Sequence, residues 1–560
     1  MEHPLSISLL WPSDIAKEKV EGTAGLEHQS YKDLGVERLV EEISFNYKYS
    51  EGIKQLLLQL CADRETIMYR LDIMEDFCSL PEMGAELESV LPLLHKLDEF
   101  HHARYMIDAE QLRKIAWQLE ILSIYTEFVS TLNGILNRYR EKIKSEGLHR
   151  LLQFTGQLIE DETFRSLTAE LPDLRAKLQG VSSVTLRIHL NHELKPEQAV
   201  ILSLDSKTEK KRSLLSRLLG MKSEADEYGG VSQYQSIVKQ NSLALDSALL
   251  NSLEQVFSDS LLPIGAVLKR FIDVNTRPVT SLELEIGFYI GASRFIHKIM
   301  DAGLPMCKPE VVPAAERVCR VEDMFDPVLA IGLIRQYPDI QLSNTIVTND
   351  VEFGPKGTIY ILTGPNQGGK TTYTRAIGLL QVLLQAGIYV PGRKAAISPA
   401  DRIFTHFSEE EKPNLDHGRL GEESKRLQSI FMSATPQSLI LLNESFSSTS
   451  HLDSYFLARD VVKGIKMLGC RTVYATHILE LAAEADRMNE EEPGEGRLVS
   501  MVAGVDLEQT GEQDSMMAKR TYKVQQGPPN DRSFAKDIAS LYGISFGQIV
   551  QTLKDRKVIK

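Results

Sequence analysis

One short segment constrains the fold of this chain more than any other. Residues 364–371 read Gly-Pro-Asn-Gln-Gly-Gly-Lys-Thr and fit the pattern G-x-x-x-x-G-K-[ST]. A strand-like apolar run at 359–363 precedes the segment, and a helical pattern at 371–384 follows it. In this order, backbone N–H groups can surround phosphate oxygens at a helix N-terminus, the lysine bridges the β and γ phosphates, and the threonine hydroxyl binds magnesium. The segment therefore predicts a nucleotide site in an α/β domain.

Two further strand-like runs, 438–442 and 471–475, end close to polar residues. In nucleotide hydrolases with such a loop, an aspartate at the end of the next strand orients the magnesium shell and a glutamate positions the attacking water. Glu444 fits the second role, whereas Asn443 lacks the charge for the first. His477, just after the third strand, can sense the γ-phosphate by hydrogen bonding. The residues expected to carry the chemistry are Lys370, Thr371, Asn443, Glu444 and His477.

The rest of the chain divides by the spacing of its apolar residues. From about 33 to 178 they recur every three or four positions, which predicts helices. Between 181 and 204 they alternate, which predicts a small antiparallel sheet. The helical spacing returns at 233–302, and beyond residue 305 strand-like and helical runs alternate, as in a buried parallel sheet with covering helices. The sequence predicts a multidomain α and α/β protein.

Composition excludes several classes of protein. The chain has 63 Lys and Arg against 77 Asp and Glu, a net charge of −14, so it does not coat nucleic acid with uniform positive charge. No apolar run approaches the ~20 residues of a membrane helix, and the N-terminus lacks the basic region of an export signal. Five scattered cysteines have no zinc-binding spacing. We expect a cytoplasmic protein with reduced thiols and no membrane partner.

Five motifs together resemble the ATPase domain of the MutS family, and 63–77 resembles the helical core of that family. The resemblance implies a helical core and lever with a small antiparallel clamp sheet, followed by a P-loop ABC-type ATPase domain. The motifs are TGPNQGGKTT (363–372), YVPGRKAAISPADRIFTHF (389–407), LILLNESFSSTS (439–450), TVYATH (472–477) and YKVQQGPPNDRSFAKDIASLYGIS (522–545). The expected domains are an N-terminal segment at 1–45, core and lever at 46–180, a clamp-like insertion at 181–232, a returning lever at 233–320, and the ATPase domain with a dimerisation tail at 321–560.

The resemblance also implies roles for individual residues. Adenine contacts would come from Thr348, Asn349 and Asp350, and contacts to a second copy of the chain from Gly421 and Asp453. The phosphate and magnesium loop would comprise Gly364, Pro365, Asn366, Gln367, Gly368, Gly369, Lys370, Thr371 and Thr372. A basic run in the clamp-like insertion, with Glu209 as its single acid, would face DNA backbone; its cations are Lys207, Lys210, Lys211, Arg212, Arg217 and Lys222. Such a run can equally be a solvated loop.

The chain departs from the family pattern in four places. Asn443 replaces the usual aspartate, so magnesium affinity should be weaker and hydrolysis slow. The loop expected at 418–423 reads Gly-Arg-Leu-Gly-Glu-Glu and lacks the hydroxyl that would reach the partner's γ-phosphate, although a backbone donor near Gly421 can serve. Core-like sequence begins by about residue 50, which leaves no room for a mismatch-reading domain. We also expect no C-terminal nuclease extension.

The resulting expectation is a MutS-like, homodimeric, ATP-dependent DNA-binding protein that uses ATP and Mg²⁺. It would clamp duplex, branched or mismatched DNA in repair or recombination. One alternative is mismatch repair in which a partner protein supplies recognition. Another is a nucleotide-gated protein scaffold with little hydrolysis and no DNA contact.

Overall fold

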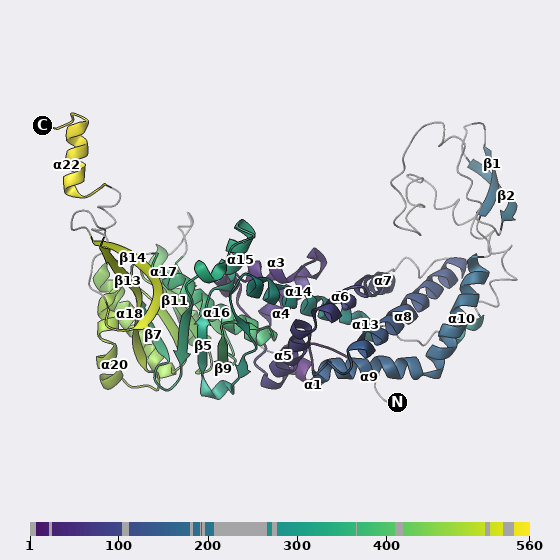
Figure 1. Cartoon of the computed structure of the whole chain (residues 1–560), viewed down its shortest axis with the longest axis horizontal. Helices are drawn as coiled ribbons and strands as arrows, with labels where there is room; N and C mark the ends of the chain where they lie inside the picture. The colour runs from purple at the N-terminus through teal and green to yellow at the C-terminus, as the bar shows by residue number, and fades with distance from the viewer. Residues whose placement is uncertain are drawn as a thin grey trace. The chain divides into compact units, whose positions relative to one another are not determined.

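The computed structural model divides the chain into two compact units (Figure 1). The first unit comprises Met1–Glu88, Tyr139–Leu151 and Leu284–Lys560, and the second comprises Ser89–Arg138 and Leu152–Glu283. The residues that the structure describes are 7–21, 25–102, 111–179, 183–190, 192, 196–205, 266–271, 277–365, 367–408, 418–447, 449–509, 516–529 and 543–559.

A six-stranded sheet forms the centre of the first unit's α/β part. Its strand order is β10-β11-β12-β7-β13-β14, and every neighbouring pair is parallel except β13 and β14. The predicted parallel sheet is therefore confirmed, with an antiparallel strand added at one edge. The strands are β7 (Ile359–Thr363), β10 (Ile403–Phe407), β11 (Leu439–Asn443), β12 (Arg471–Ala475), β13 (Leu498–Gln509) and β14 (Met516–Gln526).

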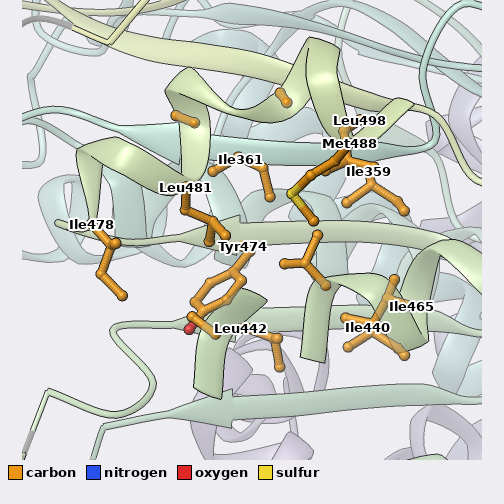
Figure 2. Packing of buried hydrophobic residues seen from close by; sticks show 14 of the residues in the cluster. Ile359, Ile361, Ile440, Leu442, Ile465, Tyr474, Ile478, Leu481, Met488 and Leu498 are labelled. Carbon is orange, nitrogen blue, oxygen red and sulfur yellow. The ribbon is translucent and has the colours of Figure 1, made fainter. Parts of the chain in front are cut away.

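Helices cover both faces of this sheet. On one face, alternate strand residues such as Ile440 and Leu442 join a buried apolar cluster with four helices, and Figure 2 shows Tyr474 and Leu481 in the same cluster. On the other face lies α16 (Lys370–Ala386), which also contacts α2, α4 and α5. The helices on the first face are α17 (Gly418–Ser433), α18 (His451–Leu468), α19 (Leu479–Ala483) and α20 (Ala485–Glu491). Because side chains alternate between the two covered faces, the four short parallel strands are buried along their whole length.

A second, smaller sheet lies in the same unit and supports one wall of the site described below. Its order is β4-β9-β5-β6, from β4 (Glu310–Val311), β5 (Cys319–Met324), β6 (Asn349–Phe353) and β9 (Lys394–Ile397). β3 (Met306–Cys307) pairs separately with β8 (Val390–Pro391). After β5, the chain enters α15 (Pro327–Gln336), whose first turn is capped by the carboxylate of Asp326 and begins with proline.

The predicted helical core is confirmed as helical. Asp63 caps α5 (Arg64–Ser79) by accepting a hydrogen bond from the backbone N–H of Thr66. Ser30 of α2 donates to the backbone oxygen of Ile403, so this helix covers the edge strand β10. The remaining helices and 3₁₀ turns of the first unit are α1 (Asp14–Glu21), α2 (His28–Leu34), α3 (Val36–Ile43), η1 (Tyr47–Tyr49), α4 (Ser50–Leu58), α6 (Pro81–Glu88), α14 (Leu282–Asp301), η5 (Ala314–Glu316), η6 (Leu342–Asn344) and α22 (Phe546–Asp555).

The second unit is helical, with one β-hairpin. Apolar residues of α8 and α10, including Leu119 and Leu171, pack with Leu268 and Phe271. The antiparallel pair predicted at 181–204 is confirmed, whereas the predicted DNA-contacting cations at 207–222 lie outside the described residues. The elements are α7 (Leu91–His102), α8 (Gln111–Tyr139), α9 (Glu146–Glu160), α10 (Glu162–Gln179), β1 (Ser183–Leu190), β2 (Pro196–Asp205), η4 (Lys269–Phe271) and α13 (Arg277–Thr280).

None of the helices in the described part of the chain combines the length and the apolar character needed to cross a bilayer.

Candidate nucleotide-binding site

The segment between β7 and α16 forms a tight glycine-dependent turn. Gly364 has φ +139° and Gly369 has φ +92°, values that side chains disfavour. A Cβ atom on Gly368 would lie 2.9 Å from the backbone oxygen of Pro365. The turn ends at the N-terminus of α16, where backbone N–H groups without helical partners are available for an anion. Asn366 lies outside the described residues.

Lys370, the first residue of α16, is buried, and its Nζ donates to the backbone oxygens of Gly364 (2.9 Å) and Pro365 (3.1 Å). Burial lowers the pKa of Lys370 below its ordinary value, and the nearby charge of Glu444 opposes that effect. The ammonium group is therefore folded over its own loop. Phosphate oxygens, which are stronger acceptors than neutral carbonyls, can replace these two bonds.

Strand ends bring the predicted polar residues together. Thr371 Oγ1 donates to Asn443 Oδ1 across 3.1 Å, and His477 Nε2 lies 2.9 Å from Glu444 Oε1. The hydrogen bond from His477 is the main reason that the pKa of Glu444 lies below its ordinary value. Because β11 and β12 are parallel neighbours with Asn443 opposite Ala475, Glu444 and His477 emerge at the same edge of the sheet.

The donor set suits magnesium that arrives with a nucleotide. Magnesium prefers oxygen ligands and is usually held by one or two protein groups together with substrate phosphates and water. The Thr371 hydroxyl, the Asn443 amide oxygen and the Glu444 carboxylate supply such oxygens. Within the described residues, no group of three or more His, Cys, Asp and Glu side chains is placed to hold a metal without a nucleotide.

Lys370, Thr371 and Glu444 line a cavity of about 430 Å³, whereas Asn443 and His477 are not among its lining residues. One wall is the loop and first turn of α16, from Gln367 to Tyr373, and Glu444 lies beside it. The rest of the lining is largely apolar and includes Phe325, Leu329 and Ile346. Polar and apolar lining residues in one cavity match the two halves of a nucleotide, its phosphates and its base.

Of the three predicted adenine contacts, only Asn349 is among the residues that line this cavity. Its side chain donates to the backbone oxygen of Tyr522 and accepts from the backbone N–H of Val524, so it fastens β14 beside the loop. Thr348 Oγ1 instead donates to the carboxylate of Asp323, and the carboxylate of Asp350 accepts from the backbone N–H of that same residue.

The two residues predicted to contact a second copy of the chain lie on α17 and α18, not on α16. Gly421 is in the first turns of α17, and Asp453 is in the first turn of α18, where its carboxylate accepts from the Ser450 hydroxyl. The prediction of a loop at 418–423 is wrong, because α17 already begins at Gly418. The residues that follow, Glu-Glu-Ser-Lys-Arg-Leu, include several strong helix formers that continue the helix.

Sequence reasoning missed several residues around the cavity. Tyr522 lines it from β14, and Asp326 lines it while pairing with Arg375 of α16. The sequence did contain a signal for Tyr522, because this residue is the first of the motif at 522–545. Backbone strain is a further marker: of the eight described non-glycine residues with positive φ, five lie at or beside the site, namely Asp323, Gln367, Glu444, Phe446 and Tyr522.

Family comparisons match two separate stretches of the chain. The model of MutS domain V matches residues 360–556, which include the strand, loop and helix described above. The model of the MutS2 N-terminal domain matches residues 62–302.

Curated relatives also match part of this chain. The DNA mismatch repair protein MutS of Chloroflexus aurantiacus (strain J-10-fl) is 35% identical over 172 residues, 30% of this chain and 17% of the relative. The DNA mismatch repair protein MutS of Finegoldia magna is 34% identical over 214 residues, 37% of this chain and 23% of the relative. The matched region thus spans less than a quarter of either relative. The model of the MutS2 N-terminal domain matches first along the chain, and the model of MutS domain V follows it. The chain therefore belongs to the MutS family.

Proposed function

We propose that this chain is a MutS-like ATPase whose ABC-type nucleotide domain couples ATP binding and hydrolysis to the clamping of DNA. The observation that carries the ATPase part is that Lys370, Thr371 and Glu444 line one cavity of about 430 Å³ together with apolar residues. The DNA part rests on family membership, since the matched relatives are named DNA mismatch repair proteins.

In this proposal each residue has a distinct task. Bound Mg²⁺ would neutralise charge on the β and γ phosphate oxygens. Lys370 exchanges its two carbonyl partners for phosphate oxygens and holds the negative charge that develops during transfer. Glu444 aligns a water molecule for in-line attack and accepts its proton, while His477 keeps that carboxylate ionised and oriented.

The clamping part uses residues beyond the cavity. Two copies would close with the α17 and α18 N-termini, near Gly421 and Asp453, facing the partner's nucleotide. The basic residues at 207–222 would then contact DNA phosphates, and the protein would act in the cytoplasm. Mismatch repair with recognition supplied by a partner is a narrower form of the same proposal.

One observation favours a second candidate function. Asn443 offers a neutral oxygen to Thr371 where hydrolysing relatives are expected to offer a carboxylate, so turnover can be slow. Slow turnover of a bound nucleotide is sufficient for a nucleotide-gated scaffold with little hydrolysis and no DNA contact.

A nucleotide-binding assay tests directly whether the cavity beside Lys370 is a nucleotide site. Titration with a fluorescent ATP analogue should give saturable binding that Lys370→Ala abolishes and that Lys356→Ala, an exposed lysine outside the cavity, leaves unchanged. Retained binding in Lys370→Ala would show that the loop is misassigned.

DNA binding separates the two candidate functions. Gel shifts across a salt series should show binding that falls with a log–log slope of about −5, because six phosphate contacts each contribute about −0.9. Phosphate release with and without DNA should differ. No shift, or a flat salt dependence with no effect of DNA on turnover, supports the scaffold and contradicts the clamp.

A further inference from the structure

The turn that follows β11 holds two non-glycine residues in the left-handed conformation. Glu444 has φ +57° and Phe446 has φ +65°. Such backbone conformations persist only where surrounding groups hold them in place. Because Glu444 is itself part of the turn, the groups that hold the turn also set the direction of its carboxylate.

Several hydrogen bonds hold this turn, and three of them join a buried side chain to the backbone of the turn. Glu423 Oε2 accepts a 2.8 Å hydrogen bond from the backbone N–H of Phe446, and the Ser454 hydroxyl donates to the Phe446 backbone oxygen across 2.6 Å. The Tyr474 hydroxyl donates to the Ser445 backbone oxygen across 3.4 Å. The contact from Glu423 is the one made by a carboxylate, and hydrogen bonds to charged groups are the stronger kind.

Glu423 belongs to α17, two residues beyond Gly421. The same helix also packs on the turn, because Phe446 lies in the buried cluster with Leu427 and Ile430 of α17. Glu423 is itself only 8% exposed and is not among the residues that line the nucleotide cavity. The first turns of α17 and the turn at 444–446 are therefore joined by both a carboxylate hydrogen bond and apolar packing.

We propose that Glu423 is a positioning residue for hydrolysis: it holds the left-handed turn at Phe446, keeps Glu444 against His477, and makes the Glu444 carboxylate follow movements of the first turns of α17. A group that presses on those turns, such as the nucleotide of a second copy of this chain, would then act on Glu444 through Glu423. This inference rests on the proposed ATPase function.

Steady-state hydrolysis and nucleotide binding in three variants test the proposal. Glu423→Ala should lower kcat by about tenfold or more while the Kd for a fluorescent ATP analogue changes by less than about twofold, because Glu423 does not touch the nucleotide. Glu423→Gln keeps an oxygen that can accept from Phe446, so its kcat should return to within about threefold of the parent protein. Gln428→Ala, an exposed residue later in the same helix, is the matched control and should behave as the parent does.

Hydrogen exchange gives a readout that does not depend on turnover. In Glu423→Ala, amide exchange in a peptide covering 443–450 should become about tenfold faster, while exchange in β12 stays unchanged. An unchanged kcat, an unchanged exchange rate, or an equal loss of nucleotide affinity and kcat in Glu423→Ala overturns the proposal. A parent protein that binds no nucleotide or never releases phosphate counts against the proposed function instead, and the exchange comparison then still decides whether Glu423 holds the turn.

Discussion

The hydroxyl of Thr371 donates to Oδ1 of Asn443 across 3.1 Å and so joins the start of α16 to the end of β11. This bond brings together the two neutral oxygens that would face magnesium. An aspartate at the same place would add a full negative charge, and charge-assisted contacts are roughly twice as strong as neutral ones. We therefore expect the neutral Oδ1 of Asn443 to limit the affinity of the proposed site for magnesium.

Asn443→Asp should strengthen magnesium binding and speed hydrolysis. We expect the half-saturating magnesium concentration to fall about tenfold, equivalent to about 1.4 kcal/mol, because the new carboxylate attracts the cation more strongly. Phosphate release measured across a magnesium titration checks this. Asn46→Asp adds the same charge at an exposed position that does not line the cavity and should change nothing. An unchanged magnesium dependence in Asn443→Asp would show that Asn443 does not face the metal.

The local parts of this site were predictable from the sequence, and the reason is physical. The strands 359–363 and 471–475 were predicted with the bounds that the structure has, because each is buried along its whole length and is rich in β-branched and aromatic residues. Gly369 and Gly387, both with positive φ, mark the two ends of α16.

The remaining site residues depend on contacts between distant segments. Tyr522 lies more than 150 positions beyond the loop it borders, and Glu423 is a buried carboxylate whose partner is a backbone N–H of another element. No periodicity encodes such pairings, because each side chain taken alone reads as an ordinary exposed residue. The prediction of a loop at 418–423 followed the family resemblance, although the residues after Gly421 favour the helix that begins at Gly418.

Removing the imidazole of His477 should shift the pH dependence of hydrolysis. The hydrogen bond from His477 holds the pKa of Glu444 below its ordinary value, so the carboxylate stays ionised in more acidic solution. In His477→Ala that bond is lost and burial, which raises the pKa, is left less opposed. The acidic limb of the kcat profile should therefore move to higher pH. His451→Ala removes a similar imidazole from Glu480 outside the cavity, and its profile should match that of the parent protein.

Breaking the buried pair of Asp326 and Arg375 should destabilise the wall of the cavity. Asp326 is fully buried, caps α15 through the backbone N–H groups of Val328 and Leu329, and accepts from Arg375 Nε across 2.6 Å. Burial raises the pKa of Asp326 despite the arginine. Arg375→Met leaves that carboxylate without its cation and should cost about 3 kcal/mol of unfolding free energy.

Urea denaturation of the parent protein, Arg375→Met and a double variant distinguishes loss of the ion pair from the cost of an uncompensated buried charge. The double variant Asp326→Asn with Arg375→Met removes both charges and should recover much of the stability lost in Arg375→Met, because the uncompensated buried charge is gone. Equal stability of Arg375→Met and the parent protein would mean that the ion pair contributes nothing to the wall.

Glu285 should make the stability of the first unit depend on pH in an unusual direction. Burial raises its pKa to about 7, although the Ser8 hydroxyl and the Leu9 backbone N–H both donate to it. The folded protein then holds a proton on Glu285 that the unfolded chain releases near pH 4.5. Because the folded state binds more protons in this window, the stabilisation is complete below about pH 4.5 and is lost as the pH rises to about 7.

Glu285→Gln should remove that dependence, since glutamine imitates the protonated carboxyl at every pH. Each pKa unit corresponds to about 1.4 kcal/mol, so the variant should gain about 3 kcal/mol relative to the parent protein between the acidic and the neutral end of the window. Chemical denaturation at pH 5 and pH 8 measures the gain. Glu316→Gln changes an exposed carboxylate and serves as the control. If Glu285→Gln is less stable than the parent protein at pH 8, then the folded state favours the ionised carboxylate, its pKa is not raised, and the negative charge is what fastens residues 8 and 9 to α14.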